Sequence, residues 1–238
     1  GWQLWAAAMF LSMANLIAIL DMTIANVSVL TIAGGLAVTP TQGTWVITSF
    51  GVANAISVPL TGWLTMRFGA VRLFTLSVLL FVVASWMCGL APSLEILIAF
   101  RVLQGLVAGP MIPLSQTLLL SSYPRAKSGM ALAMWSVTTL VAPVVGPLLG
   151  GWITDTWSWR WIFYVNVPLV GASVLTTYLF IHENRELTAK RGAAPIDYWG
   201  LIFVTMWLGT LQVVLQEGQK DDWFQSPFIF WTSVTSLL

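Results

Sequence analysis

The sequence predicts an all-α integral membrane protein, a bundle of transmembrane helices followed by the start of two further helices. Hydrophobic residues make up 58% of the chain and charged residues only 8%, whereas about 25% of a soluble domain is charged. The apolar runs are continuous and do not alternate with polar residues, which excludes a transmembrane β-barrel. They have about the 20 residues that a helix needs to cross about 30 Å of hydrocarbon.

The apolar runs divide the chain into three parts. We predict a six-helix bundle in residues 1–181, a linker over residues 182–196 and two more helices in residues 197–238, the second of them incomplete. Because the chain begins without a methionine and ends inside an apolar run, we expect it to be a segment of a longer protein. The predicted spans are 4–29, 43–66, 72–91, 94–117, 129–153, 160–181 and 197–216, with an eighth from about residue 228.

Basic residues predict the orientation of these spans. One set of alternate loops holds seven of them, and the opposite side holds only Arg160 and Lys220. The positive-inside rule then places the first set, the linker and the amino terminus in the cytoplasm. Trp157, Trp159 and Trp161 lie at the mouth of a helix on the other side, where we interpret them as an interfacial anchor. The cytoplasmic set comprises Arg67, Arg72, Arg125, Lys127, Arg185, Lys190 and Arg191.

Two opposite charges lie inside the predicted spans. Asp21 interrupts the apolar run Leu16–Leu30, and Arg101 lies at a similar depth in the fourth span. A charge at membrane depth costs at least about 2.5–3.5 kcal/mol on insertion scales and usually serves the movement of protons, ions or substrates. If the two side chains pair, the site can bind and release a proton. The alternatives are a hydrogen-bonded structural acid and a static ion pair that fixes helix register.

Polar and small residues follow one face of two spans. In the fourth span they begin at Arg101 and continue through Gln104, Gly105 and Ser115, and in the second span they include Asn54. Faces of this kind either line a cavity or hydrogen-bond between helices. The sequence leaves both interpretations open.

The fifth span combines prolines with glycines. Pro143 and Pro147 each remove a backbone donor, so we expect them to kink the helix. Gly146 and Gly150 form a small-xxx-small face that lets a neighbouring helix approach closely, and Gly151 follows directly. Simple packing explains a lone pair of such glycines, but two prolines among them indicate a specialised helix.

Enzymatic chemistry finds little support in the composition. The chain has one cysteine, Cys88, and one histidine, His182, so we expect no disulfide framework, no metal site and no cofactor. No nucleophile stands near a base at a suitable spacing. An intramembrane enzyme is therefore the weakest hypothesis.

Four stretches together resemble the major facilitator superfamily, and within it the fourteen-helix drug:proton antiporters of the EmrB type. Leu20–Leu30 is similar to the first-helix motif of that group. Leu97–Gly109 resembles the fourth-helix motif, with Arg101 and Gly105 in its proton-linked positions. Val145–Gly151 resembles the fifth-helix antiporter motif, which importers generally lack.

The fourth stretch, Gly62–Arg72, resembles the loop motif between helices two and three but departs from it. The acidic residue of the family pattern would fall at Met66, so a gating contact through that carboxylate is not expected here. Trp159–Pro168 and Gln42–Gly51 strengthen the match. The motif residues retained in the loop are Gly62, Arg67, Gly69 and Arg72.

The resemblance implies the amino-terminal six-helix bundle of a major facilitator fold with the start of two inserted central helices. It implies efflux of hydrophobic or amphiphilic drugs, or fatty acids, in exchange for protons across the bacterial inner membrane. Asp21 and Arg101 would be the proton-coupling residues, and a periplasmic membrane-fusion adaptor and an outer-membrane channel would be partners. The candidate residues of the substrate cavity are Asn26, Asn54, Gln104, Ser115 and Trp135.

Two other functions compete with drug export. A nutrient importer or facilitator would share the fold, although the proline and glycine pattern of the fifth span argues against it. A non-transporting sensor or scaffold would bind a ligand without flux, and both membrane-depth charges would then be structural.

Overall fold

The computed structural model describes residues 2–124, 127–168 and 197–237. These ranges are almost entirely helical and contain no strand, which confirms the all-α prediction. The elements are α1 (Trp2–Gly35), α2 (Pro40–Gly43), α3 (Trp45–Phe68), α4 (Ala70–Leu90), α5 (Leu94–Ala108), α6 (Met111–Ser122), α7 (Ser128–Thr156), α8 (Trp161–Tyr164), α11 (Tyr198–Glu217), the 3₁₀ turn η2 (Trp223–Gln225) and α12 (Pro227–Leu237).

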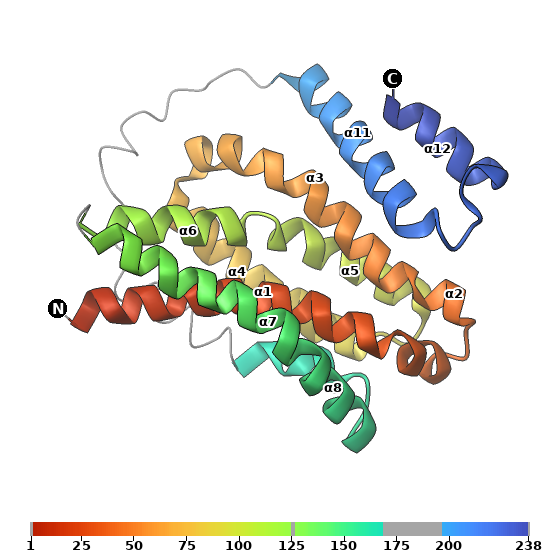
Figure 1. Cartoon of the computed structure of the whole chain (residues 1–238), viewed down its shortest axis with the longest axis horizontal. Helices are drawn as coiled ribbons and strands as arrows, with labels where there is room; N and C mark the ends of the chain where they lie inside the picture. Colours follow the sequence, from red (N-terminus) through yellow and green to blue (C-terminus); the bar gives the residue numbers. More distant parts are fainter. Residues whose placement is uncertain (1, 125–126, 169–196, 238) are drawn as a thin grey trace.

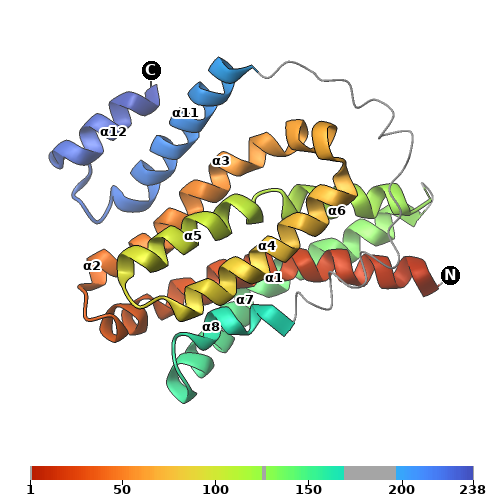
Figure 2. The same ribbon diagram turned by 180° about the vertical axis from the view of Figure 1, so that it is seen from behind.

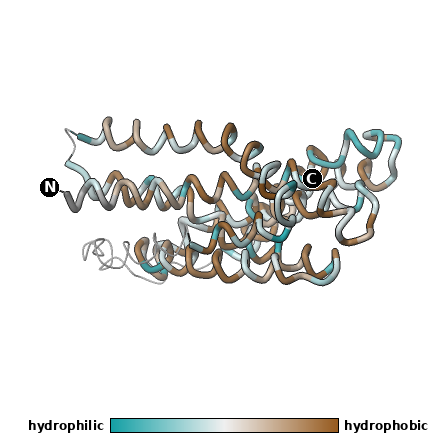
Figure 3. Tube along the Cα trace, turned by 90° about the horizontal axis from the view of Figure 1, so that it is seen from below, coloured by the Kyte–Doolittle hydropathy of each residue, from teal (hydrophilic) through white to brown (hydrophobic). Residues whose placement is uncertain are grey.

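Six helical stretches among the described residues are long and apolar enough to cross a membrane, and Figure 3 shows hydrophobic residues along the length of the long helices. They correspond to predicted spans one to five and seven, and α12 begins close to the predicted start of the eighth. Most of the predicted sixth span and the whole linker 182–196 lie outside the described residues. The six stretches are Ala8–Gly35, Pro40–Phe68, Ala70–Leu90, Leu94–Ser122, Ser128–Thr156 and Tyr198–Glu217.

The first helix is longer than predicted. α1 continues to Gly35, because Ile32 and Ala33 are buried and extend its apolar face. The predicted end at residue 29 was therefore wrong. The connection to α3 contains the short helix α2, which Thr39 caps and which has Pro40 at its first position, where the missing N–H of proline costs nothing.

The predicted fourth span is divided into two helices. α5 ends at Ala108 and α6 begins at Met111, so the span predicted over residues 94–117 is interrupted at residues 109 and 110. Pro110 at the junction has no N–H to donate to the preceding turn. The two pieces still cover one membrane-length stretch that ends at Ser122.

The turn between α3 and α4 is tighter than predicted. Gly69 alone separates the two helices, with a φ of 86°. Only glycine adopts this conformation without strain. The expected five-residue turn over Arg67–Val71 is therefore mostly helical.

Two pairs of parallel helices form much of the bundle. α1 packs along α7, and α3 packs along α5 with α4 beside it (Figure 1). α11 and α12 contact each other, and α11 lies along α3 in the views from both sides (Figure 2). The helices after the linker therefore dock on the bundle through α3.

A layer of polar side chains separates two apolar clusters of the core. On α4, Ser85 falls between Phe81 of the first cluster and Cys88 of the second. Asp21 and Arg101 fall at the same boundary on α1 and α5. The charges predicted at membrane depth therefore lie between the two halves of the apolar core.

Candidate functional site

A buried ion pair joins α1 to α5. Nη1 of Arg101 lies 2.5 Å from Oδ2 of Asp21, and the two residues are 0% and 2% exposed. The sequence placed both charges at comparable depth, and the structure brings them into contact. Removing one partner of such a pair would leave an uncompensated charge in the core, at a cost of about 3–5 kcal/mol.

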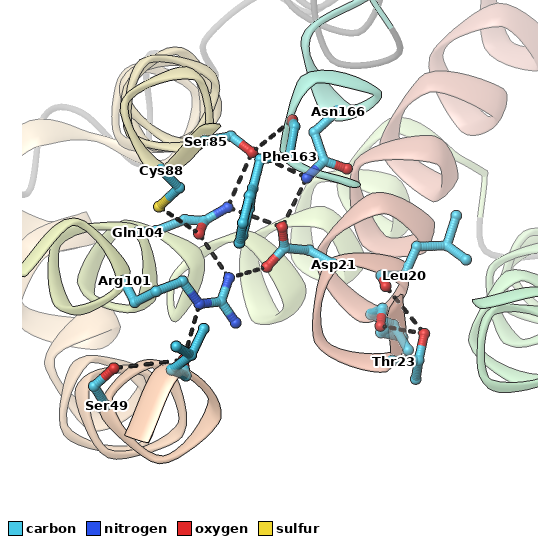
Figure 4. A network of polar contacts seen from close by, with 12 residues as sticks. Leu20, Asp21, Thr23, Ser49, Ser85, Cys88, Arg101, Gln104, Phe163 and Asn166 are labelled. Atoms are coloured by element: carbon cyan, nitrogen blue, oxygen red, sulfur yellow. Dashed lines mark hydrogen bonds and ion pairs between the residues drawn. The ribbon is translucent and has the colours of Figure 1, made fainter. Parts of the chain in front are cut away.

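The second carboxylate oxygen of Asp21 accepts two amide hydrogen bonds. Nε2 of Gln104 donates to Oδ1 over 3.0 Å and Nδ2 of Asn166 donates over 2.7 Å. Both amides also donate to Oγ of Ser85, which itself donates to the carbonyl oxygen of Phe163. Figure 4 shows these side chains converging from α1, α4, α5 and the segment after α8.

We call Asp21, Ser85, Arg101, Gln104 and Asn166 the polar network. All five residues are at most 2% exposed. Both carboxylate oxygens of Asp21 have hydrogen-bond donors, one of them the guanidinium of Arg101. The network therefore gives hydrogen-bond partners to the carboxylate of Asp21 within the apolar core.

Arg101 is enclosed by groups that suit a cation. Its Nε donates to the carbonyl oxygen of Val46 over 3.0 Å, and its Nη1 also donates to Oε1 of Gln104 over 2.7 Å. Its Cζ lies 4.2 Å from the centroid of the Phe50 ring, within the range of a cation–π contact. Its Nη2 has no hydrogen-bond partner within the described residues.

Gly105 in α5 and Gly109 directly after it allow the close approach that builds this site. A Cβ on Gly105 would lie 2.5 Å from the carbonyl oxygen of Phe50, and one on Gly109 would lie 2.6 Å from Cβ of Ser57. Side chains at these positions would push α3 away. The glycines therefore bring the first turns of α3, with the carbonyl of Val46, within reach of Arg101.

The glycines of the proposed antiporter motif perform the same task on the other seam. A Cβ on Gly146 would overlap the side chain of Thr23, and one on Gly150 would lie 2.8 Å from Cγ2 of Val27. Gly151 has no atom within 4 Å of the corresponding position. Two of the three glycines therefore face α1.

The two prolines of this motif lie on the outer side of α7. Pro143 and Pro147 are exposed, and α7 is assigned as one helix across both of them. The face opposite them buries Ala142, Gly146 and Gly150. The prolines therefore leave the helix unbroken and do not enter its seam with α1.

The candidate cavity residues do not gather at one surface of the described structure. Gln104 and Ser115 are 0% exposed. Gln104 belongs to the polar network, and Ser115 accepts from Nε1 of Trp135 over 3.0 Å. Asn26 is exposed on α1, and Asn54 is half-buried on α3 beside the glycines of α5. Sequence spacing identified which residues share a helix face, but it did not specify what each face contacts in the bundle.

The loop motif surrounds the α3–α4 turn. Gly69 is the turn residue itself, and the Arg67 guanidinium lies 5.5 Å from the ring of Trp63. Gly62 is exposed, with no atom near a Cβ placed on it, and Arg72 is exposed on the first turn of α4. Glycine is therefore required at position 69, because the turn needs a positive φ there.

Sequence reasoning missed Ser85 and Asn166 in the network. Asn166 occurs in the stretch Trp159–Pro168, which was used only for its resemblance. An amide in an apolar run is itself a signal, because its N–H groups need partners at membrane depth. Ser85 carries no comparable signal, since a serine can bond to its own helix.

Glu217 is a second buried acid, which the sequence analysis did not single out. It is 2% exposed at the end of α11. Thr48 donates to one of its carboxylate oxygens and Thr44 to the other, and Nζ of Lys220 lies 3.3 Å from Oε1. Gln212, Gln216 and Glu217 are polar residues near the end of an otherwise apolar helix. Their occurrence together is the signal that would have identified this contact.

The buried charges and the long apolar helices define a polytopic membrane protein of the transporter class. The chain belongs to the Major Facilitator Superfamily, whose profile matches residues 11–236. It is 55% identical over 228 residues to the multidrug export protein EmrB of Haemophilus influenzae, covering 96% of this chain and 44% of that protein.

Two other relatives are similarly close. EmrB of Escherichia coli K12 is 51% identical over 238 residues, covering 100% of this chain and 46% of that protein. The fatty acid resistance protein FarB of Neisseria gonorrhoeae is 50% identical over 228 residues, covering 96% of this chain and 44% of that protein. The chain spans a little under half the length of these curated relatives, and the resemblance to EmrB-type transporters is confirmed.

Solved structures confirm the major facilitator fold. The peptide transporter POT in complex with sulfate matches with a TM-score of 0.68 at 15% identity, covering 98% of this chain and 49% of that chain. The D-xylose-proton symporter matches with a TM-score of 0.66 at 13% identity, covering 98% and 65%. At these identities the likeness concerns the fold alone.

Proposed function

We propose that the protein is a proton-coupled antiporter that exports hydrophobic or amphiphilic compounds. The observation that carries the proposal is the buried ion pair of Asp21 and Arg101, which holds an ionisable group between the two halves of the apolar core. Relatives at 50–55% identity bear the names multidrug export protein and fatty acid resistance protein. These names support export of apolar cargo.

Asp21 is the proton-binding group of this mechanism. When its carboxylate accepts a proton, Arg101 loses its counter-charge and the buried network becomes positively charged. A substrate whose binding opposes that protonation couples the two fluxes, because each ligand then lowers the affinity for the other. Each charge that crosses 100 mV supplies about 2.3 kcal/mol to the exchange.

The surroundings of the site complete the proposal. The seam between α1 and α7, which includes Gly146 and Gly150, belongs to the exporter form of the fold. Asn26, Asn54 and Trp135 remain our candidates for the wall of the substrate cavity. The protein lies in the bacterial inner membrane with a cytoplasmic amino terminus, and it passes its cargo to a periplasmic adaptor and an outer-membrane channel.

Replacing the coupling acid tests this function. The protein at its full natural length is reconstituted in proteoliposomes, and proton-driven uphill movement of ethidium and of a long-chain fatty acid is measured. We expect Asp21→Asn to abolish uphill movement, because the amide is isosteric but cannot exchange a proton.

Asp155→Asn is the matched control, since Asp155 is exposed near the end of α7 and should leave transport unchanged. Uphill movement that survives in Asp21→Asn would exclude Asp21 as the coupling acid. If the unmodified protein binds both probes but does not move them, the scaffold function is favoured. If the probes move in the same direction as the protons, an importer is favoured.

A further inference from the structure

Asn166 is the one donor to Asp21, among the described residues, that does not come from α5. Arg101 and Gln104 lie one turn apart on that helix, whereas Asn166 follows α8 and is 145 residues away from Asp21 in sequence. Its Nδ2 lies 2.7 Å from Oδ1 of Asp21 and 3.0 Å from Oγ of Ser85. The contact therefore ties the segment of residues 161–168 to both α1 and α4.

The two amides on Asp21 differ in how firmly their orientation is held. Oε1 of Gln104 accepts from Nη1 of Arg101 over 2.7 Å, and its Nε2 donates to Asp21 and to Ser85. Turning this amide over would place its oxygen against Asp21 and its nitrogen against the guanidinium. Gln104 is therefore fixed by Arg101, and that constraint does not act on Asn166.

A proton on Asp21 changes what its oxygens can do. The ionised carboxylate only accepts hydrogen bonds, but the protonated oxygen becomes a donor. Oδ2 faces the Arg101 guanidinium, so a proton is accommodated with less repulsion at Oδ1. Oδ1 then no longer suits two N–H donors, and one amide must turn over or withdraw.

From this difference, and building on the proposed function, we infer that Asn166 is a positioning residue for proton binding. It stabilises the ionised carboxylate, and it transmits the arrival of a proton to the segment of residues 161–168. The transmission needs no covalent step: the proton binds to Oδ1, and the hydrogen bond from Asn166 is the contact that is lost or reversed. Ser85 supports this transmission, because its Oγ accepts from Nδ2 of Asn166 and donates to the carbonyl oxygen of Phe163.

Asn166→Leu tests the inference because leucine has a similar volume and cannot hydrogen-bond. In proteoliposomes the pH of half-maximal proton-driven ethidium exchange should rise by about one unit, a tenfold change in proton concentration, since a donor to the charged form is lost. Infrared difference spectra between acid and alkaline samples should show a shifted carboxyl band. The band is assigned to Asp21 by its disappearance in the Asp21→Asn variant. Asn166→Gln keeps an amide donor, so its pH profile and its carboxyl band should lie closer to those of the unmodified protein than those of Asn166→Leu.

Asn15→Leu is the matched control. Asn15 is also fully buried, and its Nδ2 also makes two hydrogen bonds, to Thr138 and Thr139, but neither touches the polar network. We expect Asn15→Leu to lose about as much thermal stability as Asn166→Leu. Its pH profile and carboxyl band should stay those of the unmodified protein.

An unchanged pH profile and carboxyl band in Asn166→Leu would overturn the inference. Should that variant not accumulate in the membrane, Ser85→Ala, which removes the shared acceptor of both amides, is judged by the same two measurements. If Asp21→Asn abolishes coupling while Asn166→Leu keeps the original profile, this inference fails and the proposed function stands. Coupling that survives in Asp21→Asn overturns both.

Discussion

The polar network shows how a bilayer-depth charge is made tolerable residue by residue. Asp21 receives a guanidinium on one oxygen and two amides on the other, and Arg101 receives a carboxylate, a backbone carbonyl and an aromatic face. Such partners offset the desolvation of both charges, but a buried pair often adds little to stability compared with apolar residues of the same volume. A gain in stability is therefore a weak explanation of this ion pair, and the proton-binding role that we propose for Asp21 offers another.

A double-mutant cycle on the ion pair provides a prediction at this scale. Arg101→Met should lower the free energy of unfolding by about 3–5 kcal/mol, because it leaves the Asp21 carboxylate buried without a counter-charge. Combining it with Asp21→Asn should recover part of that loss. Denaturation of the purified protein in detergent measures all four corners of the cycle. Additive effects would show that the two side chains are not coupled.

The sequence predicted the two charges of the site but not their amide partners. Asp21 and Arg101 stand out because any charge in an apolar helix does. Gln104 was placed on the same helix face as Arg101, and both belong to the polar network, but the spacing along α5 does not specify which neighbour covers that face. Asn166 reaches Asp21 from a remote part of the chain, which no local pattern reveals.

At the scale of helices, two seams with the same construction support the bundle. On each seam two glycines four residues apart face a parallel neighbouring helix, Gly105 and Gly109 toward α3 and Gly146 and Gly150 toward α1. Helices in lipid associate largely through close packing, since burying apolar surface gains little there. The glycines are consequently placed where the backbones must come closest.

Substitution at the α1–α7 seam should separate glycines that face α1 from those that do not. Gly146→Ala should reduce the free energy of unfolding by about 1–3 kcal/mol through overpacking against Thr23. Gly151→Ala should be tolerated, because no atom lies within 4 Å of the added methyl group. Thermal unfolding in detergent compares the two variants, and equal losses would contradict the described seam.

Glu217 is a polar contact between α11 and α3, and we expect the docking of α11 to depend on it. Glu217→Leu should leave the hydroxyls of Thr44 and Thr48 without their shared carboxylate acceptor. We expect faster hydrogen exchange across α11, with the exchange of α1 and α7 unchanged. Asp222→Asn is the control, because Asp222 is exposed and asparagine tolerates its left-handed backbone conformation. Equal protection of α11 in both variants would show that the apolar contacts alone hold this helix.

The whole molecule combines apolar surfaces with one internal polar layer. The exposed side of α7 carries Leu140, Val144 and Leu148, which are 73%, 65% and 71% exposed. Apolar side chains in such positions suit lipid or another transmembrane helix. Asp21 and Arg101 are instead enclosed between the two apolar clusters, so this ion pair lies inside a bundle whose long helices carry apolar side chains outward.

The orientation of the molecule can be checked with cysteine labelling. Cys88, the single cysteine of the chain, is buried and can be replaced by alanine. In intact cells a membrane-impermeant maleimide should label Lys220→Cys, and it should label Arg67→Cys only after permeabilisation, because basic loops stay in the cytoplasm. The reverse pattern would overturn the proposed cytoplasmic amino terminus.

The sequence by itself determined the membrane class, the family and the positions of two charges that hydrocarbon tolerates poorly. It determined them because hydrophobicity, helix length and the rarity of charge in lipid are properties of the local chain. The tertiary structure decided that Asp21 meets Arg101, that Asn166 completes the carboxylate's partners and that Glu217 is buried against α3. These contacts join residues far apart in sequence, and they depend on how closely glycines allow the helices to approach.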